Sequence, residues 1–328
     1  MKHRLLGKSG FRVSEVGLGC WQLGADWGQD ISQETGFNIL NEAVKQGITF
    51  FDTADVYGNG KSEKLIGDFL KTTNAEIKVA TKFGRAANAY PDKYSKAVLR
   101  QTIEESLKRL GVDALDLLQL HCIPIQYLKD GDIFDWLREL KQEGLIKHFG
   151  ASVETVEEGL ICIEQEGILS LQVIFNVFRQ KLVNELLPQA EAKGVGIIVR
   201  LPLASGLLTG KFDNHTKFPE NDHRNYNKNG DAFNVGETFA GLPFEKGIDF
   251  VNHIKKDILP DDLTMVQLAL RWILDHKAVS SIIPGASAPK QVIGNAAVSE
   301  LDTLSPETHK ALSELYKTHV HQAIRGGY

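Results

Sequence analysis

The stretch ITFFDTADVYGNGKSE, which runs from Ile48 to Glu63, holds the first indication of the fold. Its apolar run ends in Asp52, and Tyr57 follows five residues later. The run does not alternate between polar and apolar residues, which is typical of a strand covered on both faces in a parallel sheet. We therefore predict a buried parallel strand whose carboxyl end presents a carboxylate, with a phenol just beyond it.

Seven further runs of the same kind occur along the chain. They lie at 14–20, 77–83, 115–121, 145–152, 171–177, 195–201 and 279–285. Segments with helical periodicity lie between them, and one begins after Ser32, a residue type that caps helices. Four of these segments end at a glycine, at positions 47, 111, 144 and 194. Strands that alternate with helices predict either a (β/α)8 barrel or a doubly wound sheet.

Two glycine-rich stretches bear on the choice between these folds. GLGCWQLG, residues 17–24, misses the G-x-G-x-x-G spacing, and GLLTGKF, residues 206–212, is one residue too short between its glycines for a P-loop. Eight strands without a Rossmann fingerprint favour the (β/α)8 TIM barrel, and we predict that residues 1–328 form one such domain. Residues 211–245 are polar, rich in Asn and Gly and aperiodic, so we predict a long loop after the seventh strand.

The composition limits the classes of partner. The 328 residues carry a net charge of -5, which argues against nucleic acid and anionic membrane as partners and leaves a small molecule. No run approaches the ~20 apolar residues of a membrane span, and no signal peptide is visible at the amino terminus. Three cysteines without paired spacing fit a reducing cytoplasm better than a disulfide framework. The oligomeric state cannot be inferred.

Polar residues close several of the predicted strands. Asp52, Lys82 and His121 end three neighbouring strands, and Tyr57 follows the first of them. Because the carboxyl ends of barrel strands meet at one mouth, we expect these four side chains to converge there. Ser152 and Asn176 close further strands. A phenol next to a lysine, with a neutral histidine nearby, suits proton donation to a carbonyl that becomes an alkoxide, and we expect Lys82 to lower the pKa of Tyr57.

Successive motifs of the chain resemble the signatures of the aldo-keto reductase superfamily over residues 3 to 300. They include GLGCWQLG, FFDTADVYGNGKSE, ATKFG, LLQLH, GAS, GLLTGK and IPGASAPKQVIGNA. Within the superfamily, the chain resembles the branch of bacterial general reductases and potassium-channel β-subunits. It implies a TIM barrel with an N-terminal β-hairpin, a nicotinamide cofactor bound across the mouth, and reduction of aldehydes or ketones. It also implies that Asp52, Tyr57, Lys82 and His121 are catalytic, with Tyr57 as the general acid.

The resemblance further implies a set of cofactor-binding residues. The set consists of Gly19, Cys20, Trp21, Ser152, Gln172, Arg200, Pro202, Leu203, Gly206, Leu208, Gly210, Lys211, Gly285, Ser287, Gln291 and Asn295. In the family, the positions of Ser152 and Gln172 hold the carboxamide. The loop from Ser205 to Lys211 matches a segment that embraces the pyrophosphate. Four further residues lie where the family binds the adenosine end of the cofactor, namely Gly285, Ser287, Gln291 and Asn295. Val153 and Arg200 replace an asparagine and an aromatic residue that are frequent in the family. Gly285 and Gln291 replace its basic pair for the 2′-phosphate, yet this branch commonly uses NADPH, so we expect NADP, with NAD as the alternative.

Two hypotheses on function remain open beside the leading one, and a separate question concerns the long loop. The chain could be a regulatory subunit that binds the cofactor but turns over slowly, as the channel-like branch allows. It could instead be an aldolase- or isomerase-type barrel in which Lys82 forms a Schiff base. For the segment 211–245, we weigh a surface loop without a ligand against a cover that folds over the cofactor. In the second case His223, Arg224 and Lys228 would meet a 2′-phosphate.

Overall fold

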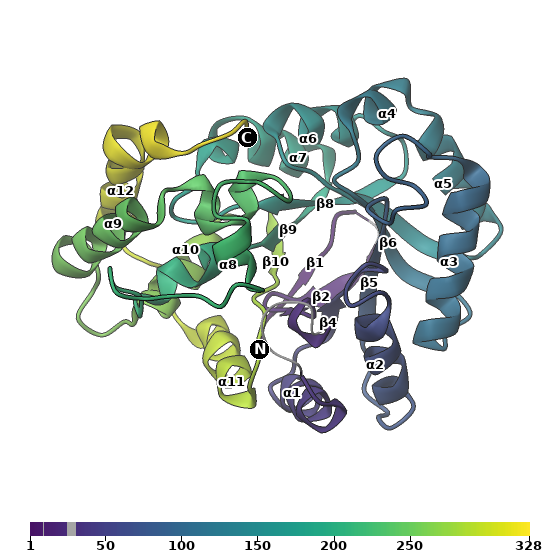
Figure 1. The fold of residues 1–328 in the computed structure, drawn as a ribbon, viewed down its shortest axis with the longest axis horizontal. Helices are drawn as coiled ribbons and strands as arrows, with labels where there is room; N and C mark the ends of the chain where they lie inside the picture. Colours follow the sequence, from purple (N-terminus) through teal and green to yellow (C-terminus); the bar gives the residue numbers. More distant parts are fainter. Residues whose placement is uncertain (9, 25–30) are drawn as a thin grey trace.

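A computed structural model describes residues 1–8, 10–24 and 31–328 of the chain. Eight parallel strands form one sheet, ordered β10-β9-β8-β7-β6-β5-β4-β3. Bridges from Val16 to Ile282 and from Gly19 to Gly285 join the first strand to the last, so the sheet closes nearly into a barrel (Figure 1). The strands are β3 (Leu18–Gly19), β4 (Phe50–Asp52), β5 (Lys78–Phe83), β6 (Leu115–His121), β7 (Ile146–Ser152), β8 (Ile168–Ile174), β9 (Gly196–Arg200) and β10 (Val279–Ile282). This arrangement confirms the predicted (β/α)8 TIM barrel.

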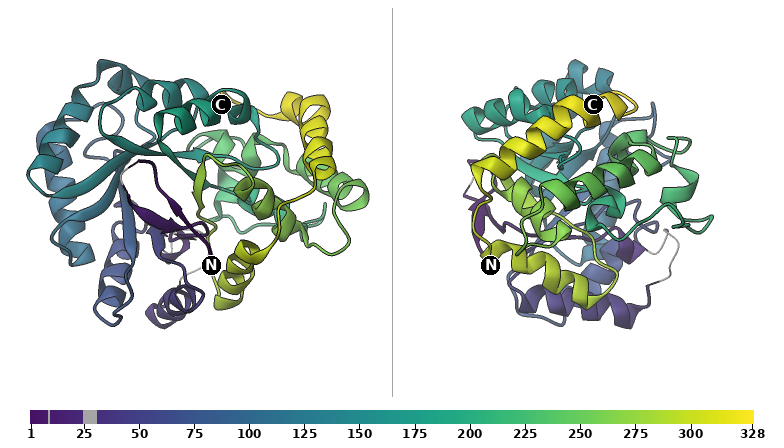
Figure 2. Two further views of the ribbon diagram at one scale, coloured as in Figure 1. Left: turned by 180° about the vertical axis from the view of Figure 1, so that it is seen from behind. Right: turned by 90° about the vertical axis from the view of Figure 1, so that its left-hand side faces the viewer.

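Helices surround the sheet, and both views in Figure 2 show them on its outside. They are α1 (Gln33–Lys45), α2 (Lys61–Leu70), α3 (Lys96–Leu110), α4 (Ile125–Asp130), α5 (Asp132–Gln142), α6 (Val156–Ile163), α7 (Leu186–Lys193), α8 (His223–Tyr226), α9 (Phe244–Asp257), α10 (Met265–Leu274), α11 (Pro289–Ala296) and α12 (Pro306–Leu315). Shorter 3-10 or π turns are η1 (Gln22–Gly24), η2 (Lys181–Asn184), η3 (Ala204–Thr209), η4 (Val235–Glu237), η5 (Phe239–Gly241), η6 (Ala297–Glu300), η7 (Tyr316–Val320) and η8 (His321–Ala323). Ser32 caps α1 by accepting a hydrogen bond from the backbone of Thr35, as its residue type predicts. No helix of the described residues is long and apolar enough to cross a membrane.

An N-terminal hairpin closes one end of the barrel. Strand β1 (His3–Leu5) pairs antiparallel with β2 (Arg12–Ser14). Leu6, Phe11 and Val13 form a cluster with residues of β4, β5, β6, β8 and β9 and with Ile283, separate from the larger core between sheet and helices. The barrel interior is therefore filled at this end, and only the carboxyl ends of the strands are left for a site.

The alternation of side chains along each strand places polar residues directly above this apolar layer. Inward-facing apolar and polar residues lie two positions apart at Phe50 and Asp52 in β4, Ala80 and Lys82 in β5, Leu117 and Gln119 in β6, and Ile198 and Arg200 in β9. Successive strand residues point to opposite faces, so residues two apart point into the same interior. The polar residues therefore meet above the apolar layer and not on the helix side of the sheet.

The segment 211–245 lies after β9, the seventh barrel strand, as predicted, but it contains more packed structure than its polar composition suggested. Phe212, Phe218, Phe239 and Phe244 pack together, with ring centroids 4.9–5.9 Å apart. Asn227 organises the turn by donating to the Thr238 hydroxyl at 3.0 Å and accepting from two backbone amides. Four aromatic rings at irregular spacing carry no helical or strand period, which is why the sequence pattern missed this small core.

Candidate active site

Lys82 lies at the centre of the carboxyl-end layer and contacts two of the other predicted catalytic residues. Its ammonium donates to Asp52 Oδ1 at 2.5 Å, to the Thr53 carbonyl at 2.7 Å and to the Tyr57 hydroxyl at 3.2 Å. The Lys82 side chain is 0% exposed and the Asp52 side chain 3%. A charged pair this deeply buried needs all of these hydrogen bonds, because each ion has lost its hydration. The structure thus brings Asp52, Tyr57 and Lys82 into one hydrogen-bonded chain.

His121 completes the group from the end of β6. Its ring lies edge-on to the Tyr57 ring, with 6.0 Å between centroids. Burial, together with the charges of Arg85, Lys82 and Arg200, holds the pKa of His121 well below its ordinary value. The imidazole is therefore neutral near pH 7, and its Nδ1 has no hydrogen-bond partner among the described residues. A neutral imidazole can donate one hydrogen bond to a substrate oxygen without competing for the proton of Tyr57.

The pKa of Tyr57 differs from the expectation. Burial raises the pKa above its ordinary value, and the opposing effect of Lys82 is too small to reverse this. For Lys82, burial acts to lower the pKa, but Asp52 and Tyr57 together raise it above its ordinary value. Tyr57 thus stays protonated and Lys82 charged near neutrality. A charged lysine is a poor nucleophile, so this environment argues against the Schiff-base hypothesis.

The second oxygen of Asp52 has two partners that also come from barrel strands. Asp52 Oδ2 accepts from Gln119 Nε2 at 3.0 Å and from Gln172 Nε2 at 2.7 Å. Gln119 is not among the predicted site residues, although it lies two residues before His121 and so faces the same interior. With Lys82 on the other oxygen, the carboxylate of Asp52 is held from three strands.

The side chains that would hold the carboxamide lie next to this carboxylate. Ser152 Oγ is 3.5 Å from Gln172 Oε1 and 3.6 Å from Cys122 Sγ, so its hydrogen-bonding capacity is only weakly used. Gln172 Oε1 has no shorter contact among the described residues, and the amide nitrogen of Gln172 donates to Asp52. A hydroxyl and an amide oxygen with free capacity, both buried, fit an incoming primary amide. Asn176, in contrast, lies beyond β8 and bonds the backbone of Leu201 and Phe178, so it has a structural role.

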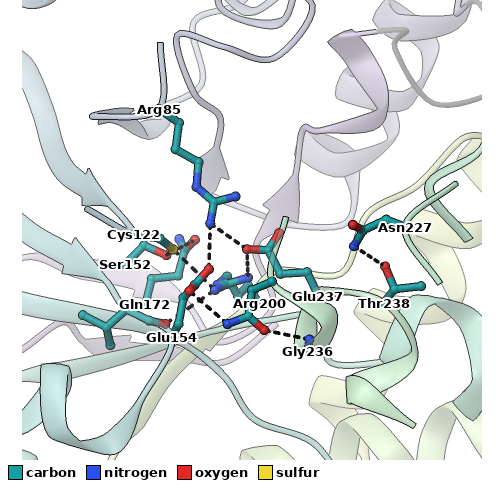
Figure 3. A network of polar contacts seen from close by, with 12 residues as sticks. Arg85, Cys122, Ser152, Glu154, Gln172, Arg200, Asn227, Gly236, Glu237 and Thr238 are labelled. Atoms are coloured by element: carbon teal, nitrogen blue, oxygen red, sulfur yellow. Dashed lines mark hydrogen bonds and ion pairs between the residues drawn. The ribbon is translucent and has the colours of Figure 1, made fainter. Parts of the chain in front are cut away.

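A network of ion pairs lies over these residues (Figure 3). Arg85 Nη2 donates to Glu154 Oε1 at 2.7 Å and to Glu237 Oε1 at 3.0 Å. Arg200 Nη1 lies 3.3 Å from the same oxygen of Glu237. Glu237 belongs to the segment 211–245, so these contacts tie that segment to the ends of barrel strands. Cys122, Glu154 and Glu237 lie close enough to hold a cation, but the two arginines already neutralise both carboxylates.

The loop after β9 contains the predicted pyrophosphate-binding residues. Ser205 and Gly206 have φ values of 54° and 95°, and Gly206 needs this freedom because a Cβ there would lie 2.9 Å from the ring of Phe212. The Ser205 hydroxyl donates to the Glu237 carbonyl at 3.1 Å and accepts from the Phe239 amide at 3.2 Å. Of the other predicted residues here, Pro202 and Leu208 are buried, Leu203 and Gly210 are partly buried, and Lys211 is exposed. The segment 211–245 therefore continues along this loop.

The predicted adenosine-binding residues lie at the start of α11. Gln291 Oε1 accepts from the Ser287 amide at 2.6 Å, the Ser287 hydroxyl at 3.1 Å and the Ala288 amide at 3.2 Å. The side chain of Gln291 thus occupies the position where the amino end of a helix binds anions, and it would have to turn away before a phosphate could accept from these amides. A Cβ on Gly285 would lie 2.2 Å from Oε1 of Gln22, so Gln22 packs against the bridge between Gly19 and Gly285. Asn295 is buried in the same helix.

Three predicted ligand contacts are already engaged within the protein. Cys20 is fully buried, its thiol pKa is raised by burial, and its carbonyl accepts from Ser62. Trp21 lies over the mouth, with ring centroids 6.2 Å from Tyr57 and 5.0 Å from His223. Arg224 donates to both oxygens of Asp222 and lies 4.5 Å from the centroid of the Phe218 ring. Arg224 would have to leave Asp222 before it could meet a 2′-phosphate.

Asp55 carries a pKa shift with a consequence for stability. Burial and the nearby Glu63 raise its pKa to about 7, against about 3.9 in an unfolded chain. Between these two pH values Asp55 is ionised only in the unfolded chain, so the free energy of unfolding falls as the pH rises. We expect Asp55→Asn to remove this penalty and to gain about 2–3 kcal/mol more at pH 8 than at pH 5. Urea unfolding at both pH values measures the difference, and equal gains would contradict the assigned shift.

The chain has counterparts of the same length. A model of the aldo/keto reductase family matches residues 15–317. The "Uncharacterized oxidoreductase YqkF" of Bacillus subtilis is 32% identical over 99% of this chain and 100% of its own. The holo structure of aldo-keto reductase AKR11C1 from Bacillus halodurans has a TM-score of 0.76 and 28% identity, over 100% of this chain and 98% of that one. The glycerol dehydrogenase AKR11B4 from Gluconobacter oxydans has a TM-score of 0.79 and 29% identity, over 99% and 98%.

Proposed function

The chain belongs to the aldo/keto reductase family, and from this premise we propose that it reduces aldehydes or ketones to alcohols with Tyr57 as the general acid. The observation that carries the proposal is the chain of contacts from Asp52 through Lys82 to the Tyr57 hydroxyl. It supports proton donation because it holds a protonated phenol beside a cation in a buried site. A neutral His121, whose ring lies edge-on to that of Tyr57, suits the binding of the carbonyl oxygen.

When bound, a reduced nicotinamide supplies the hydride that the carbonyl carbon accepts. Ser152 and Gln172 would bind the carboxamide, and Arg200 would lie against the ring as a planar cation. In our proposal, His121 donates a hydrogen bond to the substrate oxygen and so fixes the carbonyl near Tyr57. As negative charge develops on that oxygen, Lys82 stabilises it and the Tyr57 hydroxyl transfers its proton. The products are the alcohol and the oxidised cofactor, and solvent returns a proton to Tyr57.

For the cofactor we propose NADPH, with NADH as the weaker ligand. The amides at the start of α11, which Gln291 now bonds, support binding of a phosphate there. Lys290 is exposed in the same turn and is the basic residue between positions 285 and 295. We expect Lys290→Met to weaken the binding of NADPH about 2–5-fold and the binding of NADH by less, since one exposed charge contact is worth up to about 1 kcal/mol. Quenching of tryptophan fluorescence by each cofactor measures both affinities, and equal losses would contradict this assignment.

The proposed activity is tested by following NADPH absorbance at 340 nm with a panel of aldehydes and ketones. Multiple turnovers of at least one carbonyl compound support a reductase. Tight NADPH binding with a single slow turnover would support the regulatory-subunit hypothesis instead. NADPH binding without any oxidation would contradict carbonyl reduction.

A further inference from the structure

We propose that the carbonyl substrate is uncharged and hydroxylated, and that Arg85, Glu154 and Glu237 bind its hydroxyl groups beside the reacting carbonyl. This inference rests on the proposed reductase function and names its substrate class. It concerns the ion-pair network of Figure 3 and the cavity next to it.

The network is close to the groups that would perform the reaction. Arg85 and Arg200 are among the charges that lower the pKa of His121, and Glu237 is among those that act on Tyr57. Arg200 Nη2 is 3.5 Å from Cys122 Sγ, and Cys122 directly follows His121. A small carbonyl compound held between Tyr57 and His121 would therefore have these charged side chains as its neighbours.

The charges of the network determine which chemical groups of a substrate it can bind. Two arginines and two glutamates balance, and their side chains are only 12–21% exposed. An alkyl chain would displace the remaining water from these groups and would form no hydrogen bond in its place. A carboxylate on the substrate would lose its hydration next to a network that has no net positive charge to compensate for that loss. A hydroxyl group, in contrast, both donates and accepts, so it matches carboxylate and guanidinium together.

Arg85 has donors left for this purpose. Within the described chain, only its Nη2 takes part in the ion pairs, and Nη1 and Nε contact no protein acceptor. The same residue lines a cavity of about 480 Å³ between the loops after β4 and β5. The other polar side chains that line it are Asp55, Asn59, Asn88, Thr102, Glu105 and Arg109. Arg85 thus belongs both to the ion-pair network and to the wall of a polar space that can take further hydroxyl groups of the same substrate.

Three aldehydes of four carbons each test the proposal. They are erythrose, which has three hydroxyl groups, butanal, which has none, and succinic semialdehyde, which has a carboxylate. With rates corrected for the free aldehyde fraction, we expect kcat/KM for erythrose to exceed the other two about 10–100-fold, as expected for one or two hydrogen bonds to charged groups. Equal or higher values for butanal or succinic semialdehyde would overturn the substrate class and leave the reductase function intact. Absence of turnover with all three and with the wider panel would overturn both.

Two variants assign the preference to the residues named. Arg85→Met should lower the erythrose-to-butanal ratio of kcat/KM about tenfold, mainly through KM for erythrose. Asn88→Leu changes an exposed wall of the cavity without touching the ion pairs, and should lower the same ratio about threefold. Arg100→Met is the matched control, because Arg100 forms an exposed ion pair with Glu143 on α3 and α5. An unchanged ratio in both Arg85→Met and Asn88→Leu would overturn the proposal, even if one of them folds poorly.

Discussion

Replacement of Tyr57 by phenylalanine is expected to lower kcat for carbonyl reduction by at least about 10²–10⁴-fold, the usual contribution of a general acid. The variant keeps the ring and its edge-on contact with His121 but loses the only proton donor that Lys82 contacts among the described side chains. The binding of NADPH should change little, because the hydroxyl is not one of the proposed cofactor contacts. Steady-state kinetics at 340 nm and tryptophan fluorescence measure the two effects separately.

The control for this experiment is Tyr94, whose hydroxyl donates to the Gly84 carbonyl at 2.8 Å in the loop after β5. Tyr94→Phe removes a buried hydroxyl from the same side of the barrel and should cost stability without a comparable loss of kcat. A kcat of Tyr57→Phe within tenfold of the wild-type value would contradict the assignment of Tyr57 as the general acid.

Replacement of Lys82 by methionine is expected to affect both catalysis and stability. Removal of the cation leaves Asp52 buried with only two neutral donors, and breaking a buried pair in this way costs about 3–5 kcal/mol. The pKa of Tyr57, which burial already raises, should rise further because its main lowering influence is lost. In the direction of alcohol oxidation, where the phenolate accepts the proton, the alkaline rise in kcat should move to higher pH. Urea unfolding and the pH dependence of kcat measure the two effects.

A second substitution separates these two effects. The double variant Asp52→Asn/Lys82→Met removes the unpaired charge and should recover most of the lost stability, while carbonyl reduction stays low. Recovery of activity along with stability would mean that Lys82 serves the fold alone. An unchanged pH profile in the single variant would mean that Lys82 does not influence the phenol.

The strands could be predicted because each is an apolar run without alternation, which is typical of a strand covered on both faces. The convergence of the strand-end residues could be predicted because the carboxyl ends of barrel strands meet at one mouth. The apolar run 171–177 predicted a strand that ends three residues too late. Strand β8 ends at Ile174, and Phe175 packs on Trp272 instead, with ring centroids 4.9 Å apart. The ion-pair network could not be predicted. Arg85, Glu154 and Glu237 come from three loops, and isolated charged residues in loops are usually solvated. The effect of burial on the pKa of Tyr57 could not be predicted either. A sequence motif indicates a nearby lysine, but it does not indicate how much water the phenol loses on folding.

The two-layered interior of the barrel has a consequence for how this chain can vary in length. In four strands the apolar and the polar inward residues are only two positions apart, as Phe50 and Asp52 are in β4. An inserted or deleted residue within such a strand would turn every later side chain to the opposite face and exchange the reacting groups for helix-facing ones. Insertions between the strands shift no register and leave both layers in place. Length changes during divergence should therefore be confined to the loops, where substrate preference can change while the catalytic layer stays constant.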